Sequence, residues 1–214
     1  VKKDMGRVCI ARLNRELSEE NIIAVAGGTT LAAVADMMRP VRKEMLFVPA
    51  RGGLGEQVEN QANTICAEMA RKAEGTYRLL HVPDQLSNGT YQSLIKEPGV
   101  KEVLALIRSA GIVIHGIGEA KTMAKRRKSP PELLEKLERD QAVAEAFGYY
   151  FDGEGHVVHK VKTIGLQLED LKTRKAVFAV AGGASKAEAI AAFFKQGSNS
   201  ILVTDEGAAQ ALTE

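Results

Sequence analysis

Two adjacent glycines followed by two threonines, Gly27-Gly28-Thr29-Thr30, are the part of this sequence best suited to hold a ligand. The apolar run 22–26 before them predicts a short buried strand, and the apolar residues after them recur at helical spacing. Glycine lets the backbone turn sharply, and a helix start presents unpaired N–H groups with partial positive charge. With two hydroxyls added, such a turn can hold a phosphate group. A plain strand-to-helix turn would explain the glycines equally well.

This glycine turn occurs twice in the chain. The segment 24–28, Ala-Val-Ala-Gly-Gly, is repeated at 179–183, and a hydroxyl residue and an amphipathic helical pattern follow each copy. In a parallel sheet, such turns lie together at the carboxyl ends of the strands, where ligands bind. Lys186 stands beside the second copy and could neutralise an anion. The repeat therefore favours a phosphate site over a plain turn.

Another glycine-rich turn, 49–55, contains Arg51. A guanidinium group can form two parallel hydrogen bonds with a phosphate or a carboxylate. A charge-assisted hydrogen bond contributes about 1.5–3 kcal/mol, against about 1 kcal/mol for a neutral one. Arg51, Lys186 and the threonines could therefore hold a small dianion together. The alternative interpretation of Arg51 is an exposed surface arginine.

Signals for cofactors, metals and covalent catalysis are weak or missing in the sequence. Gly116-Ile117-Gly118 begins like a dinucleotide fingerprint, but Lys121 stands where the third glycine would be. The four histidines lack zinc-ligand spacing, no nucleophile motif is present, and no carboxylate pair stands out. We expect no metal, no cofactor and no catalytic residues. The basic run 125–128 could meet a phosphate, although a solvated helix face is the simpler interpretation.

Composition limits the class of protein further. The 214 residues, 45% of them apolar, suit one large α/β domain or two small ones, and a net charge of +2 indicates no general nucleic-acid or membrane surface. Cys9 and Cys66 fall within helical patterns and predict buried, reduced thiols. No apolar run approaches the roughly 20 residues needed to span a bilayer, and no signal-peptide pattern is present. We therefore expect a cytoplasmic protein with no membrane partner.

Hydrophobic periodicity predicts strands that alternate with helices along the chain. The predicted strands are 22–26, 45–48, 76–82, 111–115, 176–181 and 200–204. The predicted helices are 3–16, one from Leu31 to about Arg39, 58–73, one around 100–107, one after Pro131, 187–194, and a last one capped by Asp205. This alternation predicts an α/β fold with a mostly parallel sheet, Rossmann-like, covered by helices on both faces. The charged section 119–160, with a hairpin around 152–155, is expected to be an insertion or subdomain of a single domain 1–214.

Five motifs in order give the chain a resemblance to a known family. They are Val25–Thr30, Ala50–Gly53 with Val58–Asn63, Gly116–Gly118, Val180–Gly183 with Lys186, and Leu202–Glu206. Together they span some 180 residues and resemble the effector-binding domain of the SorC family of bacterial transcription regulators. The resemblance implies a fold similar to glucosamine-6-phosphate deaminase and ribose-5-phosphate isomerase.

The resemblance also implies a ligand and the residues that bind it. The SorC domain binds a phosphorylated sugar, and a likeness to repressors of glycolytic genes implies fructose 1,6-bisphosphate. The family pattern places ligand contacts at Thr29, Thr30, Arg51, Gln61 and Lys186, and at Glu145 near the sugar hydroxyls. Neighbouring residues complete the expected ligand-binding set: Gly28, Leu31, Gly52, Gly116 and Gly183.

Family resemblance sets expectations for partners and for catalysis as well. SorC regulators begin with a helix-turn-helix domain that does not precede Val1 here, so DNA binding is expected only through that missing N-terminal domain. A homo-oligomer, dimer or tetramer, is expected too. The kinship with deaminases and isomerases leaves an enzyme as the alternative. In the deaminases a catalytic histidine follows the counterpart of Gly116–Gly118, whereas Glu119-Ala120-Lys121 follows here, which favours a sensor over an enzyme.

Overall fold

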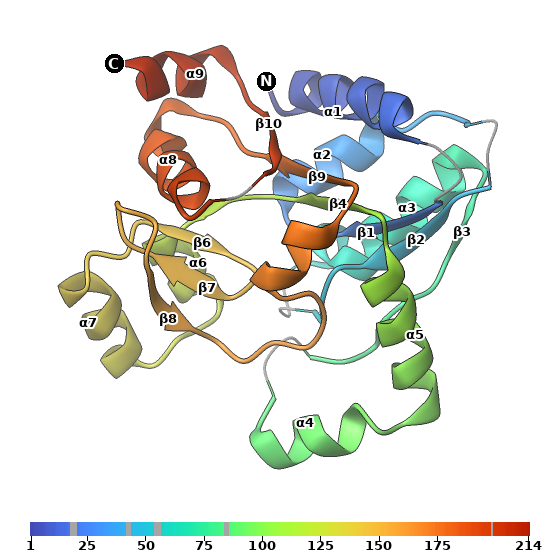
Figure 1. The fold of residues 1–214 in the computed structure, drawn as a ribbon, viewed down its shortest axis with the longest axis horizontal. Coiled ribbons are helices and arrows are strands. Elements are labelled where there is room, and N and C mark those ends of the chain that lie inside the picture. The colour runs from blue at the N-terminus through green and yellow to red at the C-terminus, as the bar shows by residue number, and fades with distance from the viewer. Residues whose placement is uncertain (18–20, 42–43, 54–56, 84–85, 198) are drawn as a thin grey trace.

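A six-stranded parallel sheet forms the centre of the computed structural model, which describes residues 1–17, 21–41, 44–53, 57–83, 86–197 and 199–214. In spatial order the strands are β10 (Ile201–Val203), β9 (Ala176–Val180), β4 (Ile112–His115), β1 (Ile22–Val25), β2 (Leu46–Pro49) and β3 (Thr76–Tyr77). Every pair in this sheet is parallel. The prediction of an α/β fold with a mostly parallel sheet is confirmed (Figure 1).

Helices cover both faces of the sheet, because alternate strand residues point to opposite sides. Ile23 and Val25 of β1 pack with three helices on one face, and Ala24 packs on the other. The helices of the first face are α1 (Lys2–Glu16), α2 (Thr29–Asp36) and α3 (Ala62–Ala73). Those of the second face are α5 (Pro98–Ser109), α8 (Ala187–Lys195) and α9 (Glu206–Thr213). The strands are buried on both faces, as parallel strands usually are.

A small antiparallel sheet lies beside the main sheet, within the chain segment between β4 and β9 (Figure 1). Its strands are β5 (Gly118–Glu119), β6 (Ala144–Ala146), β7 (Tyr149–Phe151) and β8 (Val157–Lys160), and its helices are α6 (Ala120–Arg126) and α7 (Pro131–Arg139). The predicted hairpin is confirmed, since β7 pairs with β8 across the turn at 152–156. The status of 119–160 as a separate folding unit stays a prediction.

Several predicted element boundaries are wrong. The strand predicted for 76–82 ends at Tyr77, and a short helix, α4 (Asn88–Leu94), occurs where no helix is predicted. Helix α2 ends at Asp36 rather than near Arg39. The helix predicted for 58–73 is broken: a 3-10 turn, Val58–Asn60, is followed by Gln61 with an extended backbone, and α3 begins only at Ala62.

The break at Gln61 has a structural reason. It leaves the carbonyl of Asn60 available to accept a hydrogen bond from the Gly28 N–H at 2.8 Å. This bond ties the first glycine turn to the entry of α3, and a continuous helix would have used the same carbonyl for its own backbone ladder.

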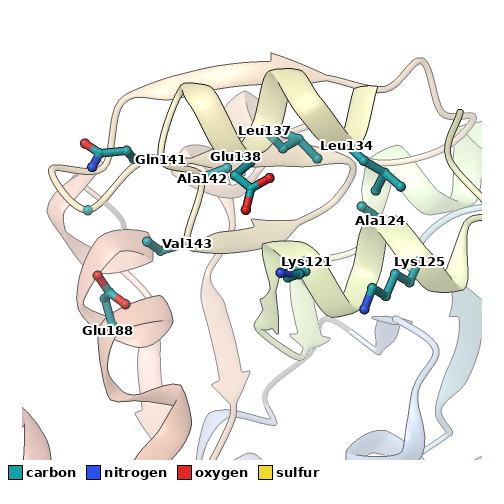
Figure 2. A pocket seen from close by; sticks show the side chains of 11 residues that line it. Lys121, Ala124, Lys125, Leu134, Leu137, Glu138, Gln141, Ala142, Val143 and Glu188 are labelled. Carbon is teal, nitrogen blue, oxygen red and sulfur yellow. The ribbon is translucent and has the colours of Figure 1, made fainter. Parts of the chain in front are cut away.

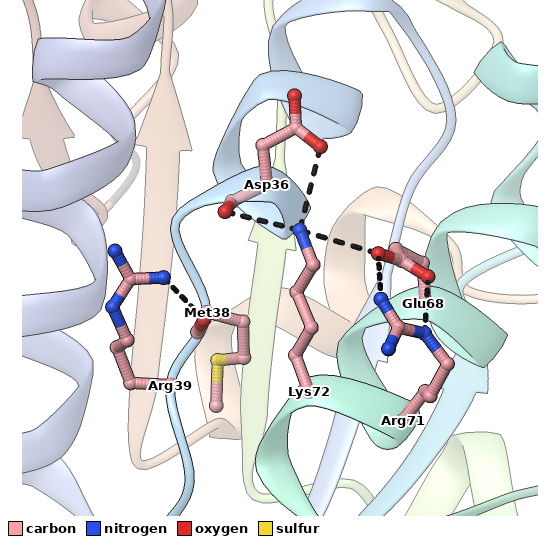
Figure 3. A network of polar contacts seen from close by, with 6 residues as sticks. All are labelled: Asp36, Met38, Arg39, Glu68, Arg71 and Lys72. Atoms are coloured by element: carbon pink, nitrogen blue, oxygen red, sulfur yellow. Dashed lines mark hydrogen bonds and ion pairs between the residues drawn. The ribbon is translucent and has the colours of Figure 1, made fainter.

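A polar network joins the far ends of α2 and α3 (Figure 3). Lys72 donates to the Asp36 carbonyl at 3.0 Å and lies 3.2 Å from a Glu68 carboxylate oxygen. Arg71 donates two hydrogen bonds to Glu68, and this is the main reason that the pKa of Glu68 is lowered to about 2. Because these groups are partly exposed, the network contributes little stability, but it fixes the relative position of two helices that begin at the predicted site.

Within the described part of the chain, no helix combines the length and apolarity needed to cross a membrane. Cys9 and Cys66 are buried free thiols, as predicted, and burial raises the pKa of Cys9 to about 12.

Candidate functional site

The two glycine turns lie at the same edge of the sheet. The first follows β1 and the second follows β9, and β4 lies between these strands, with Gly116 just beyond its carboxyl end. The two parallel strands therefore bring together turns that are more than 150 residues apart in the sequence. This is the crevice position at which open α/β sheets bind ligands.

A cavity of about 480 Å³ opens between the two turns. This volume falls within the range of small-molecule sites. Four predicted residues line it, Thr29, Thr30, Gly183 and Lys186. Gly182 of the second turn also lines it, and the other lining residues come from three further places, the first turn of α1, helix α6 with its approach, and the loop before α9: Val1, Lys2, Met5, Gly118, Glu119, Thr122, Met123, Arg126 and Asp205.

The first glycine turn presents a helix start to this cavity. Gly28 is the N-cap of α2 and adopts φ 122°, a conformation that L side chains rarely adopt. No side chain caps the helix. The hydroxyls and first-turn N–H groups of Thr29 and Thr30 are therefore at the cavity, where the helix dipole favours negative charge.

The second glycine turn is held by a carboxylate. Gly183, with φ 101°, donates its N–H to Asp205 Oδ1 at 3.0 Å, and the same oxygen caps α9 by accepting from Ala208 N at 2.9 Å. These backbone hydrogen bonds lower the pKa of Asp205. The cap predicted for Asp205 is confirmed. Asp205 accepts from the Gly183 N–H, and in the first turn the corresponding Gly28 N–H donates to the Asn60 carbonyl, so both glycine N–H groups are used within the protein and the second turn contributes mainly a cation.

That cation is Lys186, which is half-buried at the start of α8 and donates to the Ile117 carbonyl at 3.2 Å. Its pKa is lowered, first by burial and then by the charges of Lys2 and Arg126, while Glu119 opposes the change. Three cationic side chains therefore gather around one cavity at a cost in electrostatic energy. A bound anion would remove that cost.

Arg51 and Gln61 line a separate, much smaller space. It encloses about 30 Å³ beside Gly27 and Gly52. Gln61 is the N-cap of α3, not a residue one turn into a helix as the sequence predicts. The Gly27–Thr30 turn thus separates the two spaces, with Arg51 on one side and Lys186 on the other.

Glu145 is buried in an ionic cluster. Its Oε1 accepts from Arg127 Nη2 at 2.8 Å and from the Gly148 N–H at 2.6 Å, and lies 3.6 Å from Arg51 Nη1. Burial opposes the ionisation of Glu145, but the guanidinium groups of Arg127 and Arg51 outweigh it, so the pKa of Glu145 is lowered. Arg127 also donates to the Tyr150 hydroxyl at 3.1 Å. The cluster connects the Arg51 side of the site to the small antiparallel sheet.

The remaining predicted residues lie near the site without lining either space. Leu31 is buried in the core, with its Cδ2 3.4 Å from the position of a Cβ added to Gly116. The buried side chain of Leu31 therefore supports the site from the core and does not line it.

Sequence reasoning missed Lys2 and Arg126, both of which line the larger cavity. The interpretation of the run 125–128 as a solvated face holds for the exposed Lys125, Arg126 and Lys128 but not for Arg127, whose side chain is 0% exposed. The run gave one usable signal. Only Lys125 and Arg126 of the run belong to α6, and successive residues point in different directions, so four adjacent cations could not all share one solvated face.

Helix α6 separates the larger cavity from another of about 440 Å³. Thr122, Met123 and Arg126 line the first, whereas Lys121 and Lys125 line the second. Figure 2 shows Lys121 and Lys125 across from α7, with Glu188 of α8 on another side. None of the predicted ligand-binding residues lines this second cavity. Among the described residues no cluster of three or more metal-ligating side chains occurs.

A comparison with protein families identifies the class of this domain. A family model described as "Putative sugar-binding domain" matches residues 1–214. The chain belongs to this sugar-binding domain family. The larger cavity at the carboxyl edge of the sheet is therefore the candidate sugar site of a known domain type.

Relatives of this sugar-binding domain are transcription regulators. The central glycolytic genes regulators of Bacillus subtilis and Priestia megaterium are 62% and 61% identical to it, over 214 and 215 residues. Each match covers 99% of this chain but only 63% of the relative, so the chain spans less than two thirds of their length.

Solved structures agree with this assignment. A putative SorC family transcriptional regulator from Enterococcus faecalis is 49% identical, with a TM-score of 0.93 over 100% of this chain and 88% of that one. The full-length sorbitol operon regulator SorC from Klebsiella pneumoniae is 18% identical and has a TM-score of 0.88 over 100% of this chain and 71% of that one, which shows a shared fold. The sequence-based resemblance to the SorC family is confirmed.

Proposed function

We propose that this domain binds a phosphorylated sugar, most specifically fructose 1,6-bisphosphate, as the effector of a repressor of glycolytic genes. The observation that carries the proposal is the meeting of Lys2, Arg126 and Lys186 with the start of α2 around one cavity. This arrangement supplies charge, N–H groups and hydroxyls to a phosphate dianion. The high identity to central glycolytic genes regulators supports the choice of sugar.

In the proposed complex one phosphate lies between Thr29-Thr30 and Lys186, and the sugar extends toward Arg51 and Gln61. Glu145 and Gly116 are near the sugar hydroxyls. Because the space at Arg51 is now about 30 Å³, the second phosphate requires this side of the site to widen on binding. The proposed ligand thus changes the region around Gln61, where α3 begins.

The proposed role is regulation, not catalysis. The cavity combines cations and hydroxyls, whereas Glu145, the most buried carboxylate near the site, is held by Arg127 and Arg51 rather than poised to exchange a proton. We propose that ligand binding changes subunit contacts within a homo-oligomer. This change would alter the DNA affinity of a DNA-binding domain in another part of the longer regulator. We propose that the regulator acts in the cytoplasm.

Titration calorimetry of the chain with fructose 1,6-bisphosphate, fructose 6-phosphate and glucosamine 6-phosphate tests the ligand. We expect the bisphosphate to bind most tightly. Absence of binding heat from all three sugars would refute the proposed function. Equal affinity for mono- and bisphosphates would remove the second anion site while leaving the first.

Arg51→Ala tests the position of the second phosphate. We expect about ten-fold or greater weakening of bisphosphate binding, because a charge-assisted hydrogen bond is lost, and a change within about three-fold for the monophosphate. Arg51→Lys, which keeps the charge, should bind the bisphosphate with intermediate affinity. An equal loss for both sugars contradicts the assigned role.

The alternative function, a sugar-phosphate isomerase or deaminase, is tested by mass spectrometry and chromatography of each sugar after overnight incubation with the chain. We expect unchanged sugars. An isomerised or deaminated product that depends on the chain would favour the enzyme.

A further inference from the structure

The first turn of α1 lies at the candidate phosphate site, although nothing in its sequence pattern indicates a role there. Lys2 Nζ donates to Thr29 Oγ1 at 2.8 Å, so the ammonium group is placed at the start of α2. Lys2 and Met5 both line the larger cavity. Helix α1 therefore contributes a charged group to a cavity formed otherwise by the ends of strands and by α6.

The same turn of α1 also contacts the second glycine turn. A Cβ added to Gly182 would lie 2.7 Å from Met5 Sδ, which shows how closely the buried Met5 side chain approaches that backbone. At the next residue of α1, a Cβ added to Gly6 would lie 2.8 Å from the Ala33 carbonyl oxygen of α2. The start of α1 is thus packed against both glycine turns and against α2.

Lys2 belongs to the group of cations that face each other across the cavity. Burial is the main reason that the pKa of Lys186 is lowered, and the charges of Lys2 and Arg126 add to this change. An ammonium group has three donors, and Thr29 Oγ1 uses one of them. The Thr29 hydroxyl can accept from Lys2 and donate its own proton to another acceptor. A phosphate at the start of α2 can therefore contact both groups without breaking their hydrogen bond.

We propose that Lys2 is a ligand-contacting residue, which binds the phosphate held at Thr29-Thr30 and thereby fixes the first turn of α1 when the cavity is occupied. This inference rests on the proposed function, since it assumes a phosphorylated ligand in the larger cavity. It adds a ligand contact from α1. It also means that the conformational order of the first turn of α1 reports whether the cavity is occupied.

Substitutions at two adjacent lysines test the contact. Lys2→Met keeps the length of the side chain but removes its charge. Lys3→Met is the matched control, because Lys3 is also exposed on α1 and does not line the cavity. Calorimetry with fructose 1,6-bisphosphate should show affinity lower by about ten-fold for Lys2→Met, a change within about two-fold for Lys3→Met, and substantial recovery for Lys2→Arg.

Hydrogen exchange tests the consequence for α1. In the wild-type chain, saturating bisphosphate should slow exchange of the first amides of α1 that bond within the helix, such as those of Met5 and Gly6. In Lys2→Met at saturating bisphosphate this protection should be absent, while protection at the start of α2 persists. A purely structural role for Lys2 would instead change exchange in the unliganded chain.

The outcomes separate the two proposals. If the wild-type chain binds none of the sugar phosphates, the proposed function fails. If it binds the bisphosphate but Lys2→Met matches either the wild type or Lys3→Met, the role of Lys2 is refuted and the proposed function stands. Wild-type binding without protection of α1 refutes its role as a reporter.

Discussion

Neighbouring basic residues of α6 face different cavities, and this separates their roles. Arg126 lines the cavity between the glycine turns, whereas Lys125 lines the one on the opposite side of the helix. The next residue, Arg127, points inward and holds Glu145. One run of cations thus supplies a candidate ligand contact, a surface charge and a buried ion pair.

Arg126→Met should weaken binding of fructose 1,6-bisphosphate by about ten-fold or more, because a guanidinium beside the phosphate is lost. Lys125→Met removes the same formal charge one residue earlier and should change the affinity less than about two-fold. Calorimetry at two salt concentrations measures both variants. Comparable losses in the two would mean that only the general charge of α6 matters.

Site residues could be predicted from the sequence where they follow the repeated glycine turn. They could not be predicted where only tertiary packing brings a residue to the site. Thr29, Thr30 and Lys186 follow repeated glycine turns, so their place at the sheet edge follows from strand order alone. Lys2 lies in an unremarkable helical pattern, and only the packing of α1 on α2 brings it to Thr29. Periodicity marks the apolar face of a helix but not which polar residue on its other face meets a distant element.

At the scale of elements, the glycine turns require close backbone approach. A Cβ added to Gly27 would lie 2.8 Å from the Asn60 carbonyl oxygen and 3.2 Å from the Ala62 N. Both neighbours are backbone atoms at the entry of α3, so they cannot rotate away. The turn after β1 therefore requires glycine because the break before α3 brings backbone atoms close to it.

Gly27→Ala should lower the free energy of unfolding by about 1–3 kcal/mol, because the new methyl group displaces backbone at the start of α3. Bisphosphate affinity should fall as well, since the Gly28 N–H bond to Asn60 would shift. Gly99→Ala is the matched control, because an added Cβ there has no neighbour within 4 Å. Urea unfolding measures both, and equal stability of the two variants would contradict the packing argument.

Element types were predictable, but some boundaries were not. Buried strands such as Ala176–Val180 are continuous apolar runs between glycine or charged segments, and the sequence shows them directly. The run 76–82 is interrupted by Arg78 and His81, and its pairing with β2 ends after Tyr77. Gln61 is not a residue type that breaks helices. The break before α3 follows only from the contact of this segment with the glycine turn, which the sequence does not show.

At the scale of the whole molecule, a buried histidine makes stability depend on pH. His115 lies at the end of β4 between Phe147 and Phe193, with ring centroids 4.8 and 5.1 Å away. Its Nδ1 is 3.0 Å from the Gly116 carbonyl oxygen. Burial lowers the pKa of His115 to about 4, while Glu145 opposes and Arg51 adds to the change. The imidazole is thus neutral in the folded chain at pH values where it would be charged in the unfolded one.

Stability should therefore fall as pH decreases from about 6.5 toward 4, because the unfolded chain binds an additional proton in this range. Between pH 7.5 and 5 the loss from His115 is about 2 kcal/mol. His115→Phe should flatten the pH dependence of urea unfolding. Burial also lowers the pKa of His159, so urea unfolding of His159→Gln over the same pH range measures the contribution of His159 to the pH dependence. An unchanged slope in His115→Phe would show that His115 is not the group responsible.

The order of strands in the sheet has a consequence for synthesis of the chain. The larger cavity needs residues near the N-terminus, Thr29 and Thr30, together with Gly183 and Lys186 near the C-terminus. A growing chain that has not yet emerged beyond Lys186 has no such cavity, because β9 has not yet paired with β4. A metabolite bound between these turns would therefore recognise only chains in which both segments have folded together. It would also connect segments more than 150 residues apart in the sequence, so unfolding that separates them would have to release the metabolite first.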